Sequence, residues 1–148
     1  MGGVTAGERP LRTGIDGVLA GAREGLDRLA PVQAWAEVQA GAVLVDIRPE
    51  FQRRADGEVP GSVVIERVHL EWRCDPASDA KVPEATGYDV RWIVLCDEGY
   101  SSSLAAASLR GLGLHLATDV IDGFRAWVAA GLPVVHPPEP TPPRLFRG

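Results

Sequence analysis

Residues 93–112 read Ile-Val-Leu-Cys-Asp-Glu-Gly-Tyr-Ser-Ser-Ser-Leu-Ala-Ala-Ala-Ser-Leu-Arg-Gly-Leu. The aliphatic triplet that opens this stretch is typical of a strand buried on both faces, as in a parallel sheet. The serines after the loop are good helix caps, and the Leu and Ala residues that follow predict a helix over residues 101–112. A strand followed closely by a helix is the repeating unit of α/β proteins, so this stretch decides the fold class.

The same alternation of short apolar runs and helical patterns continues on both sides of this unit. Further strands are predicted at residues 43–45, 63–65 and 120–121, with residues 26–30 as a first, edge strand. Further helices are predicted at residues 31–41, where Pro31 suits the first turn, and at residues 123–130. The sequence therefore predicts an α/β fold with a central, mostly parallel sheet of about five strands and helices on both faces.

The chain of 148 residues suits one domain with a single core. Residues 1–14 are rich in Gly, Thr, Arg and Pro, and we expect them to be disordered. The folded domain should then span residues 15–133. Residues 134–148 form a proline-rich tail that cannot continue a helix or a central strand, so it should lie along the surface or stay extended and mobile.

Composition and charge exclude several classes of protein. The formal net charge is −5, with 15 basic against 20 acidic residues, which argues against partners such as nucleic acids or anionic membranes. No apolar run approaches the length of about 20 residues that a membrane helix needs. The N-terminus lacks a signal-peptide pattern, so we expect a cytoplasmic protein. The two cysteines form no Cys-x-x-Cys pair, and the three histidines show no zinc-ligand spacing.

Cys96 stands directly after the central predicted strand, at the edge of the sheet where α/β proteins bind their ligands. Gly99 lets the chain curl with a positive φ, so that successive main-chain N–H groups can converge on one point. The positive end of the following helix adds to this effect and favours a thiolate. Asp97 and Glu98 oppose the thiolate through like charge, which solvent should screen if both side chains point outward. A buried, inert thiol is the alternative.

Residues 96–102 and the helix after them resemble the active-site loop and following helix of the rhodanese family. Three other motifs stand in the same order as in that family. They are residues 43–48, similar to its strand ending in Asp-x-Arg; residues 57–62, similar to its Gly-His-Ile-Pro-Gly-Ala turn; and residues 120–127, similar to its Gly-Gly-x-x-x-Trp signature. Glu58 replaces the common His of the second motif, and Asp122 replaces the first Gly of the third. The resemblance covers roughly residues 26–133 and is to a single-domain member.

The resemblance implies a rhodanese-like fold and a thiosulfate sulfurtransferase-like enzyme. Cys96 as a thiolate would attack the outer sulfur of a small donor such as thiosulfate or mercaptopyruvate, and the loop amides would hold the resulting persulfide. An acceptor, cyanide in an assay or a thiol in a cell, would then take the sulfur in a two-step covalent scheme. The scheme requires no metal, no cofactor and no histidine base.

The resemblance also suggests roles for the residues around Cys96. The active-site loop would comprise Asp97, Glu98, Gly99, Tyr100, Ser101 and Ser102. Tyr100 would shape the rim of the pocket. Ser101 and Ser102 could offer hydroxyls to the donor, and they could equally serve to cap the helix.

Supporting roles are predicted for four residues nearer the N-terminus: Asp46, Arg48, Arg53 and Arg54. Asp46 and Arg48 would be structural and orient the end of a strand. Arg53 or Arg54 could reach the site and bind an anionic donor, although exposed arginines are more often simply solvated.

Two departures from related cysteine loops bear on the substrate. Phosphatases and arsenate reductases carry an arginine six positions after the cysteine, where this chain has Ser102, so phosphoryl transfer is disfavoured. Asp97 and Glu98 would repel a dianionic donor. We therefore expect weak affinity for thiosulfate, or a different donor such as a protein persulfide.

Two alternative functions remain open from the sequence. The domain could be a binding module that relays sulfur or merely recognises a partner, without turnover. It could also be a thiol redox sensor, which would require Cys74 to lie near Cys96 and to form a disulfide with it.

Overall fold

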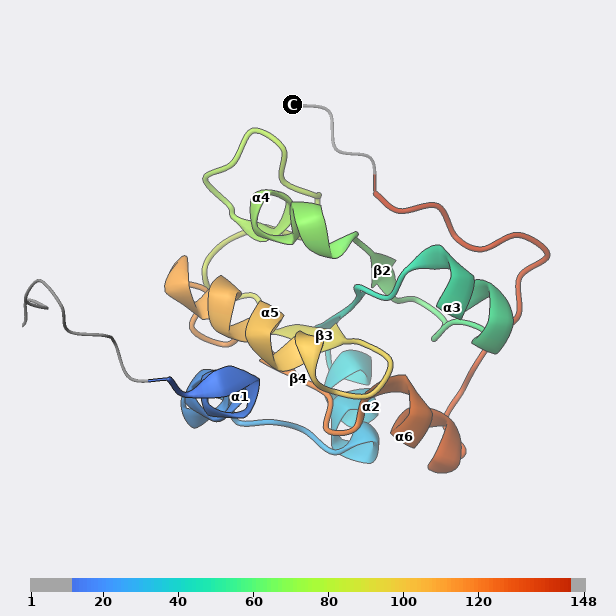
Figure 1. Ribbon diagram of the computed structural model, residues 1–148. Helices are drawn as coiled ribbons and strands as arrows, with labels where there is room; N and C mark the ends of the chain where they lie inside the picture. The colour runs from blue at the N-terminus through green and yellow to red at the C-terminus, as the bar shows by residue number, and fades with distance from the viewer. Residues whose placement is uncertain (1–11, 145–148) are drawn as a thin grey trace, which may run out of the picture.

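The computed structural model describes residues 12–144 of the chain. Its centre is a wholly parallel four-stranded sheet with the strand order β2-β1-β3-β4 (Figure 1). The strands are β1 (Val43–Asp46), β2 (Val63–Val64), β3 (Trp92–Leu95) and β4 (Thr118–Asp119). Because all four run in the same direction, their carboxyl ends meet at one edge of the sheet, and this edge carries Cys96.

Helices occupy the connections between the strands. They are α1 (Gly14–Glu24), α2 (Pro31–Gln39), α3 (Glu50–Asp56), α4 (Leu70–Cys74), α5 (Ser101–Gly111) and α6 (Gly123–Ala129), with the 3-10 turn η1 (Arg67–His69) before α4. The helices predicted at residues 31–41, 101–112 and 123–130 are confirmed to within two residues. Within residues 12–144, no helix has both the length and the apolar character needed to cross a bilayer.

The sheet is buried on both faces, as its continuous aliphatic runs predicted. Val45 and Val94 point to the face covered by α4 and α5, while Leu44 and Ile93 point to the face covered by α2 and α6. On the first face, the small side chains of α5 let the helix approach the sheet closely, and Ala105 is fully buried there. The prediction of an α/β fold with helices on both faces is confirmed.

The sheet has four strands where about five were expected. Residues 26–30 form a single parallel bridge, between Leu29 and Val120, in place of an edge strand. Leu29 N–H donates to Asp119 O at 3.0 Å, and Ile121 N–H donates to Leu29 O at 2.8 Å. The pairing stops there because Pro31, which has no N–H group, opens α2 two residues later. The last strand also lies two residues before its predicted place at residues 120–121, at Thr118–Asp119.

An N-terminal helix, α1, was not foreseen from the sequence. It packs against α5 in Figure 1. Its apolar residues Ile15, Val18, Leu19 and Ala22 do follow helical spacing, a signal that could have revealed it. Residues 1–14 were expected to be disordered; residues 1–11 lie outside the described part of the chain, and the helix begins at Gly14.

The described part of the proline-rich tail lies against α3 and β2. Val135 and Glu58 exchange main-chain hydrogen bonds of 2.8 Å in both directions. Further along, Thr141 donates to the Glu58 carboxylate through its hydroxyl at 2.6 Å and its N–H at 3.0 Å. Arg53 completes this contact, donating to Glu58 Oε2 at 2.9 Å and to Thr141 O at 2.7 Å. Glu58, where the family commonly has His, therefore contacts the tail at both Val135 and Thr141.

We call the contacts of Glu58 with Thr141 and Arg53 the Glu58 clamp. It should make the stability of the protein fall at acid pH. Burial raises the pKa of Glu58, but the hydrogen bonds from Thr141 and Arg53 outweigh it and hold the pKa below its ordinary value of 4.5. A depressed carboxyl pKa means that the stabilisation is present above about pH 4.5 and is lost as the pH falls through the lower folded-state value. Glu58→Gln should therefore lower the free energy of unfolding by about 1–3 kcal/mol at neutral pH and progressively less at acid pH.

Urea unfolding of both proteins, from neutral pH down to about pH 3, measures this difference. Glu50→Gln is the control, because Glu50 forms an ion pair with Arg54 on α3 while its side chain is 61% exposed. Equal losses for the two variants at neutral pH would contradict the clamp.

Candidate active site

A cavity of about 330 Å³ opens at the carboxyl ends of β1 and β3. It is lined by Ile47, Arg48, Pro49, Gln52, Cys96, Asp97, Glu98, Tyr100 and Ser101. A larger hollow of about 720 Å³ lies at the opposite, amino ends of the same strands, and no cysteine lines it. Because parallel sheets bind ligands at the carboxyl ends of their strands, the smaller cavity is the candidate site.

Main-chain N–H groups point at the Cys96 sulfur. Gly99 N–H lies 3.1 Å and Ser102 N–H 3.4 Å from Cys96 Sγ. The side chain reaches the cavity wall although only 5% of Cys96 is exposed. The curl of the loop requires glycine at position 99, where φ is +86° and a Cβ atom would meet the Asp122 nitrogen at 2.6 Å.

Helix α5 begins at Ser101, so its amino end faces the same sulfur through Ser102 N–H. Unpaired N–H groups at a helix amino end carry a partial positive charge, which stabilises an anion placed there. Together with the Gly99 amide, this arrangement favours a thiolate at Cys96 and can hold a negatively charged persulfide.

The two acidic loop residues differ in their surroundings. The Asp97 side chain is only 11% exposed, and its Oδ2 accepts a hydrogen bond of 2.9 Å from Arg125 Nε. Glu98 is more exposed and lies 3.9 Å from the same nitrogen. The hydrogen bond and the charge of Asp97 raise the pKa of Arg125 above its ordinary value, so the guanidinium stays charged and offsets part of the acidic charge. Sequence reasoning missed Arg125, because nothing local links α6 to this loop.

The loop side chains divide into those that face the cavity and those that do not. Tyr100 is 60% exposed and lines the cavity with Ser101, as expected for the rim. Ser102 is fully buried and donates its hydroxyl to Asp119 at 2.7 Å, so it does not offer that hydroxyl to a donor. The capping role expected of the serines is wrong: the N-cap residue is Tyr100, and no side chain of residues 12–144 caps α5.

Asp46 and Arg48 form a fully buried ion pair at the end of β1. Arg48 Nη2 lies 2.8 Å from Asp46 Oδ2 and 2.8 Å from Gly57 O. The Arg48 guanidinium also lies 3.7 Å from the ring centroid of Phe124. These contacts tie the carboxyl end of β1 to α6 and to the turn at Gly57. Arg48 forms part of the cavity wall as well.

Arg53 and Arg54 are not among the residues lining the cavity. Arg53 is 3% exposed and paired with Glu58, and Arg54 is exposed and paired with Glu50 at 2.8 Å. Helix α3 presents Gln52 to the cavity instead, because successive residues of a helix point in different directions. The structure therefore does not bring either arginine together with Cys96.

Cys74 is fully buried at the end of α4. Burial raises the pKa of its thiol far above the ordinary value, helped by the charge of Glu71, so the thiol stays protonated and inert. Both cysteines are free in the structure. These facts disfavour the redox-sensor alternative, which required a reactive Cys74.

The fold and this cysteine loop define the class of protein: the chain belongs to the rhodanese-like domain family, whose model matches residues 30–130. Among its relatives, the thiosulfate sulfurtransferase GlpE of Pseudomonas savastanoi pv. phaseolicola is 37% identical over 102 residues, covering 69% of this chain and 87% of that protein. GlpE of Haemophilus influenzae is 34% identical over 106 residues, covering 72% of this chain and 91% of that protein.

A solved structure supports the same fold. A Rhodopseudomonas palustris protein of unknown function, named as a possible tyrosine phosphatase, superposes with a TM-score of 0.76 and 31% identity. The alignment covers 86% of this chain and 98% of that chain. The family, the rhodanese-like fold and the sulfurtransferase class expected from the sequence are thus confirmed.

Proposed function

We propose that this protein is a thiosulfate sulfurtransferase-like enzyme that carries sulfane sulfur as a persulfide on Cys96. The observation that carries the proposal is the pair of main-chain N–H groups aimed at Cys96 Sγ beside a cavity at the carboxyl edge of the sheet. The names of relatives that are 34–37% identical support thiosulfate as the donor.

The reaction has two displacement steps at sulfur. The Cys96 thiolate attacks the outer sulfur of thiosulfate, a new S–S bond forms, and sulfite leaves with the electron pair of the bond that breaks. Cyanide or a thiolate then attacks the outer sulfur of the persulfide, and Cys96 leaves as a thiolate again. Each step replaces one bond to sulfur with another, so neither needs an external oxidant, a metal or a histidine base.

The main chain stabilises the charged species in both steps. Gly99 N–H and Ser102 N–H hold the attacking thiolate and, later, the same sulfur as a leaving group. Hydrogen bonds to an ionised sulfur are stronger than those to a neutral one, so these donors act most where the charge develops. In this proposal the protein works in the cytoplasm on small donors, with a protein persulfide as a further donor.

The intact mass of the protein after incubation with thiosulfate tests the proposal. The wild type should gain one sulfur atom and lose it again when cyanide is added, while Cys96→Ser should gain none. A stable gain without release to cyanide or thiols would instead favour the sulfur-relay module without turnover. No gain from thiosulfate, mercaptopyruvate or a protein persulfide would overturn the proposal.

The acidic loop residues should weaken thiosulfate binding. Asp97→Asn combined with Glu98→Gln removes two negative charges from the cavity wall and should lower KM for thiosulfate several-fold. Arg125→Gln removes the charge that offsets them and should raise KM. Steady-state kinetics at low and high salt measure both effects, which should shrink at high salt. A KM unchanged in both variants at low salt would show that these charges do not act on the donor.

A further inference from the structure

Two arginines hold the outer side of the active-site loop. The Gly99 carbonyl oxygen accepts hydrogen bonds from Arg23 Nη2 at 2.8 Å and from Arg28 Nη2 at 3.0 Å. Arg23 lies on α1, and Arg28 lies in the segment before α2. Both precede residue 30, where the match to the family model begins. The contacts therefore come from a part of this chain that precedes the match to the family model.

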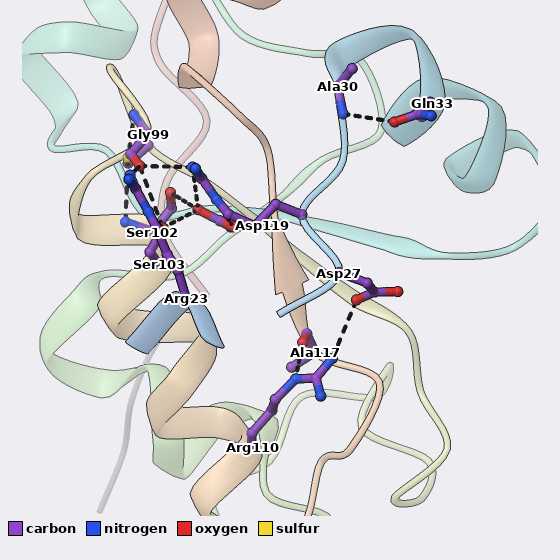
Figure 2. A network of polar contacts seen from close by, with 12 residues as sticks. Arg23, Asp27, Ala30, Gln33, Gly99, Ser102, Ser103, Arg110, Ala117 and Asp119 are labelled. Atoms are coloured by element: carbon purple, nitrogen blue, oxygen red, sulfur yellow. Dashed lines mark hydrogen bonds and ion pairs between the residues drawn. The ribbon is translucent and has the colours of Figure 1, made fainter. Parts of the chain in front are cut away.

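A buried carboxylate joins Arg28 to the start of α5, where Arg23 Nε donates to Ser103 Oγ at 3.0 Å. Asp119, fully buried at the carboxyl end of β4, pairs through Oδ1 with Arg28 Nε at 2.9 Å. Its Oδ2 accepts the hydroxyls of Ser102 and Ser103, each at 2.7 Å. Figure 2 shows Arg23, Ser102 and Ser103 gathered beside Asp119 and Gly99. We call Arg23, Arg28, Ser102, Ser103 and Asp119 the loop clamp.

The loop clamp acts on the two residues whose N–H groups face the sulfur, Gly99 and Ser102. Gly99 turns its N–H towards Cys96 Sγ and its carbonyl towards the arginines. Because a trans peptide sets its C=O and N–H in opposite directions, fixing the Gly99 carbonyl also fixes the direction of the Tyr100 N–H, away from the arginines. Ser102 is held at both ends, with its hydroxyl on Asp119 and its N–H on the sulfur.

Such fixing matters at this loop because glycine at position 99 has access to many backbone conformations. Without an external partner, the peptide between Gly99 and Tyr100 could rotate and shift the start of α5, including Ser102 N–H, relative to the sulfur. Two charged donors on one carbonyl oppose that rotation, since charge-assisted hydrogen bonds are stronger than neutral ones. The loop clamp also carries two positive charges against one negative charge, a net charge of the sign that favours a thiolate nearby.

We propose that Arg23 and Arg28, together with Asp119, are positioning residues that keep the main-chain amides aimed at Cys96. Helix α1 then supports the active-site loop through Arg23. The inference rests on the proposed function of Cys96 as the sulfur carrier. It assigns to the N-terminal segment the task of holding the loop around that cysteine in the geometry needed for reaction.

Arg23→Gln is the most informative variant, because it leaves the buried Arg28–Asp119 pair intact. Its matched control is Arg110→Gln. Arg110 lies at the far end of α5, donates to Ala117 O at 2.7 Å and to Asp27 Oδ1 at 3.2 Å, and is drawn with both partners in Figure 2. Both variants remove one partly buried guanidinium held by a carbonyl, and only the first one touches the loop.

The readout is the rate of Cys96 alkylation by iodoacetamide as a function of pH, followed by peptide mass. Arg23→Gln should slow alkylation at neutral pH roughly threefold to tenfold and move the midpoint of the pH profile upward. Arg110→Gln should leave the midpoint where it is in the wild type. Arg23→Lys, which keeps a charged donor, should recover part of the rate. Thermal unfolding shows whether stability changes equally in the two glutamine variants.

Steady-state kinetics complete the test. The proposal expects kcat for sulfur transfer to fall in Arg23→Gln but not in Arg110→Gln. An alkylation profile for Arg23→Gln that matches the one for Arg110→Gln would overturn the loop clamp, even if the wild type forms the persulfide. Failure of the sulfurtransferase proposal would be seen separately, as a wild type that takes up no sulfur while its alkylation profile still responds to Arg23.

Discussion

Cys96→Ser is expected to abolish sulfur transfer, with a loss on the order of 10³-fold or more in thiocyanate formation from thiosulfate and cyanide. A serine hydroxyl is not ionised at neutral pH and does not form the covalent sulfur intermediate, so the two-step route is closed. The fold should survive, because serine keeps the shape of the side chain at a position that is 5% exposed and bounded by N–H donors. Circular dichroism and thermal unfolding of the variant check that point.

Cys74→Ala is the matched control for this prediction. Cys74 is fully buried among apolar residues, so its loss should cost stability, about 1–3 kcal/mol, and leave sulfur transfer largely unchanged. The opposite pattern, with activity retained in Cys96→Ser and lost in Cys74→Ala, would exclude Cys96 as the carrier. Activity lost in both folded variants would point to a disulfide mechanism and revive the redox-sensor alternative.

The features that sequence reasoning predicted well are those set by neighbouring residues. The Ile93–Leu95 triplet, the cysteine at its end, Gly99 and the α5 pattern all lie within about 20 residues of chain. Their geometry follows from local periodicity and from the backbone freedom of glycine. Asp46 and Arg48, which were expected to orient the end of a strand, are two positions apart and form a buried ion pair there.

The features that were missed depend on contacts between distant parts of the chain. Arg28 and Asp119 are 91 positions apart, and Arg53 meets the Thr141 carbonyl across 88 positions. In neither pair does the sequence around one residue indicate which distant residue it will contact. The same reasoning explains the error at Ser102: its place after the loop suggested a ligand or cap, but only the sheet brings Asp119 beneath it.

The parallel arrangement of the strands gives one general rule for which residues lie near Cys96. All parallel strands end at one edge of the sheet, so a carboxylate at the end of β4 must lie close to Cys96 at the end of β3. Asp119 is such a residue. Because a buried carboxylate requires partners, its presence predicts arginines or hydroxyls nearby even before their identity is known.

The second large effect is expected at the buried ion pair. Asp46→Ala leaves the Arg48 guanidinium without a counterion in a fully buried site, and breaking such pairs typically costs about 3–5 kcal/mol. We expect a loss of stability near the upper end of that range, because Arg48 has few other partners. Its Nη1 already has no hydrogen-bond partner among residues 12–144, and the Gly57 carbonyl and the Phe124 ring would remain as its polar and cation–π partners. Urea unfolding at neutral pH measures the change.

Two comparisons make this expectation specific. Glu50→Ala breaks an ion pair whose side chains are 61% and 56% exposed, and it should cost no more than about 0.5 kcal/mol. The double variant Asp46→Leu with Arg48→Met removes both buried charges and should be more stable than Asp46→Ala alone, because no unpaired charge remains. If Asp46→Ala costs no more than Glu50→Ala, the pair does not hold the end of β1. Since Arg48 also lines the cavity, the double variant should then reveal whether a guanidinium at this wall assists the donor, through its KM for thiosulfate.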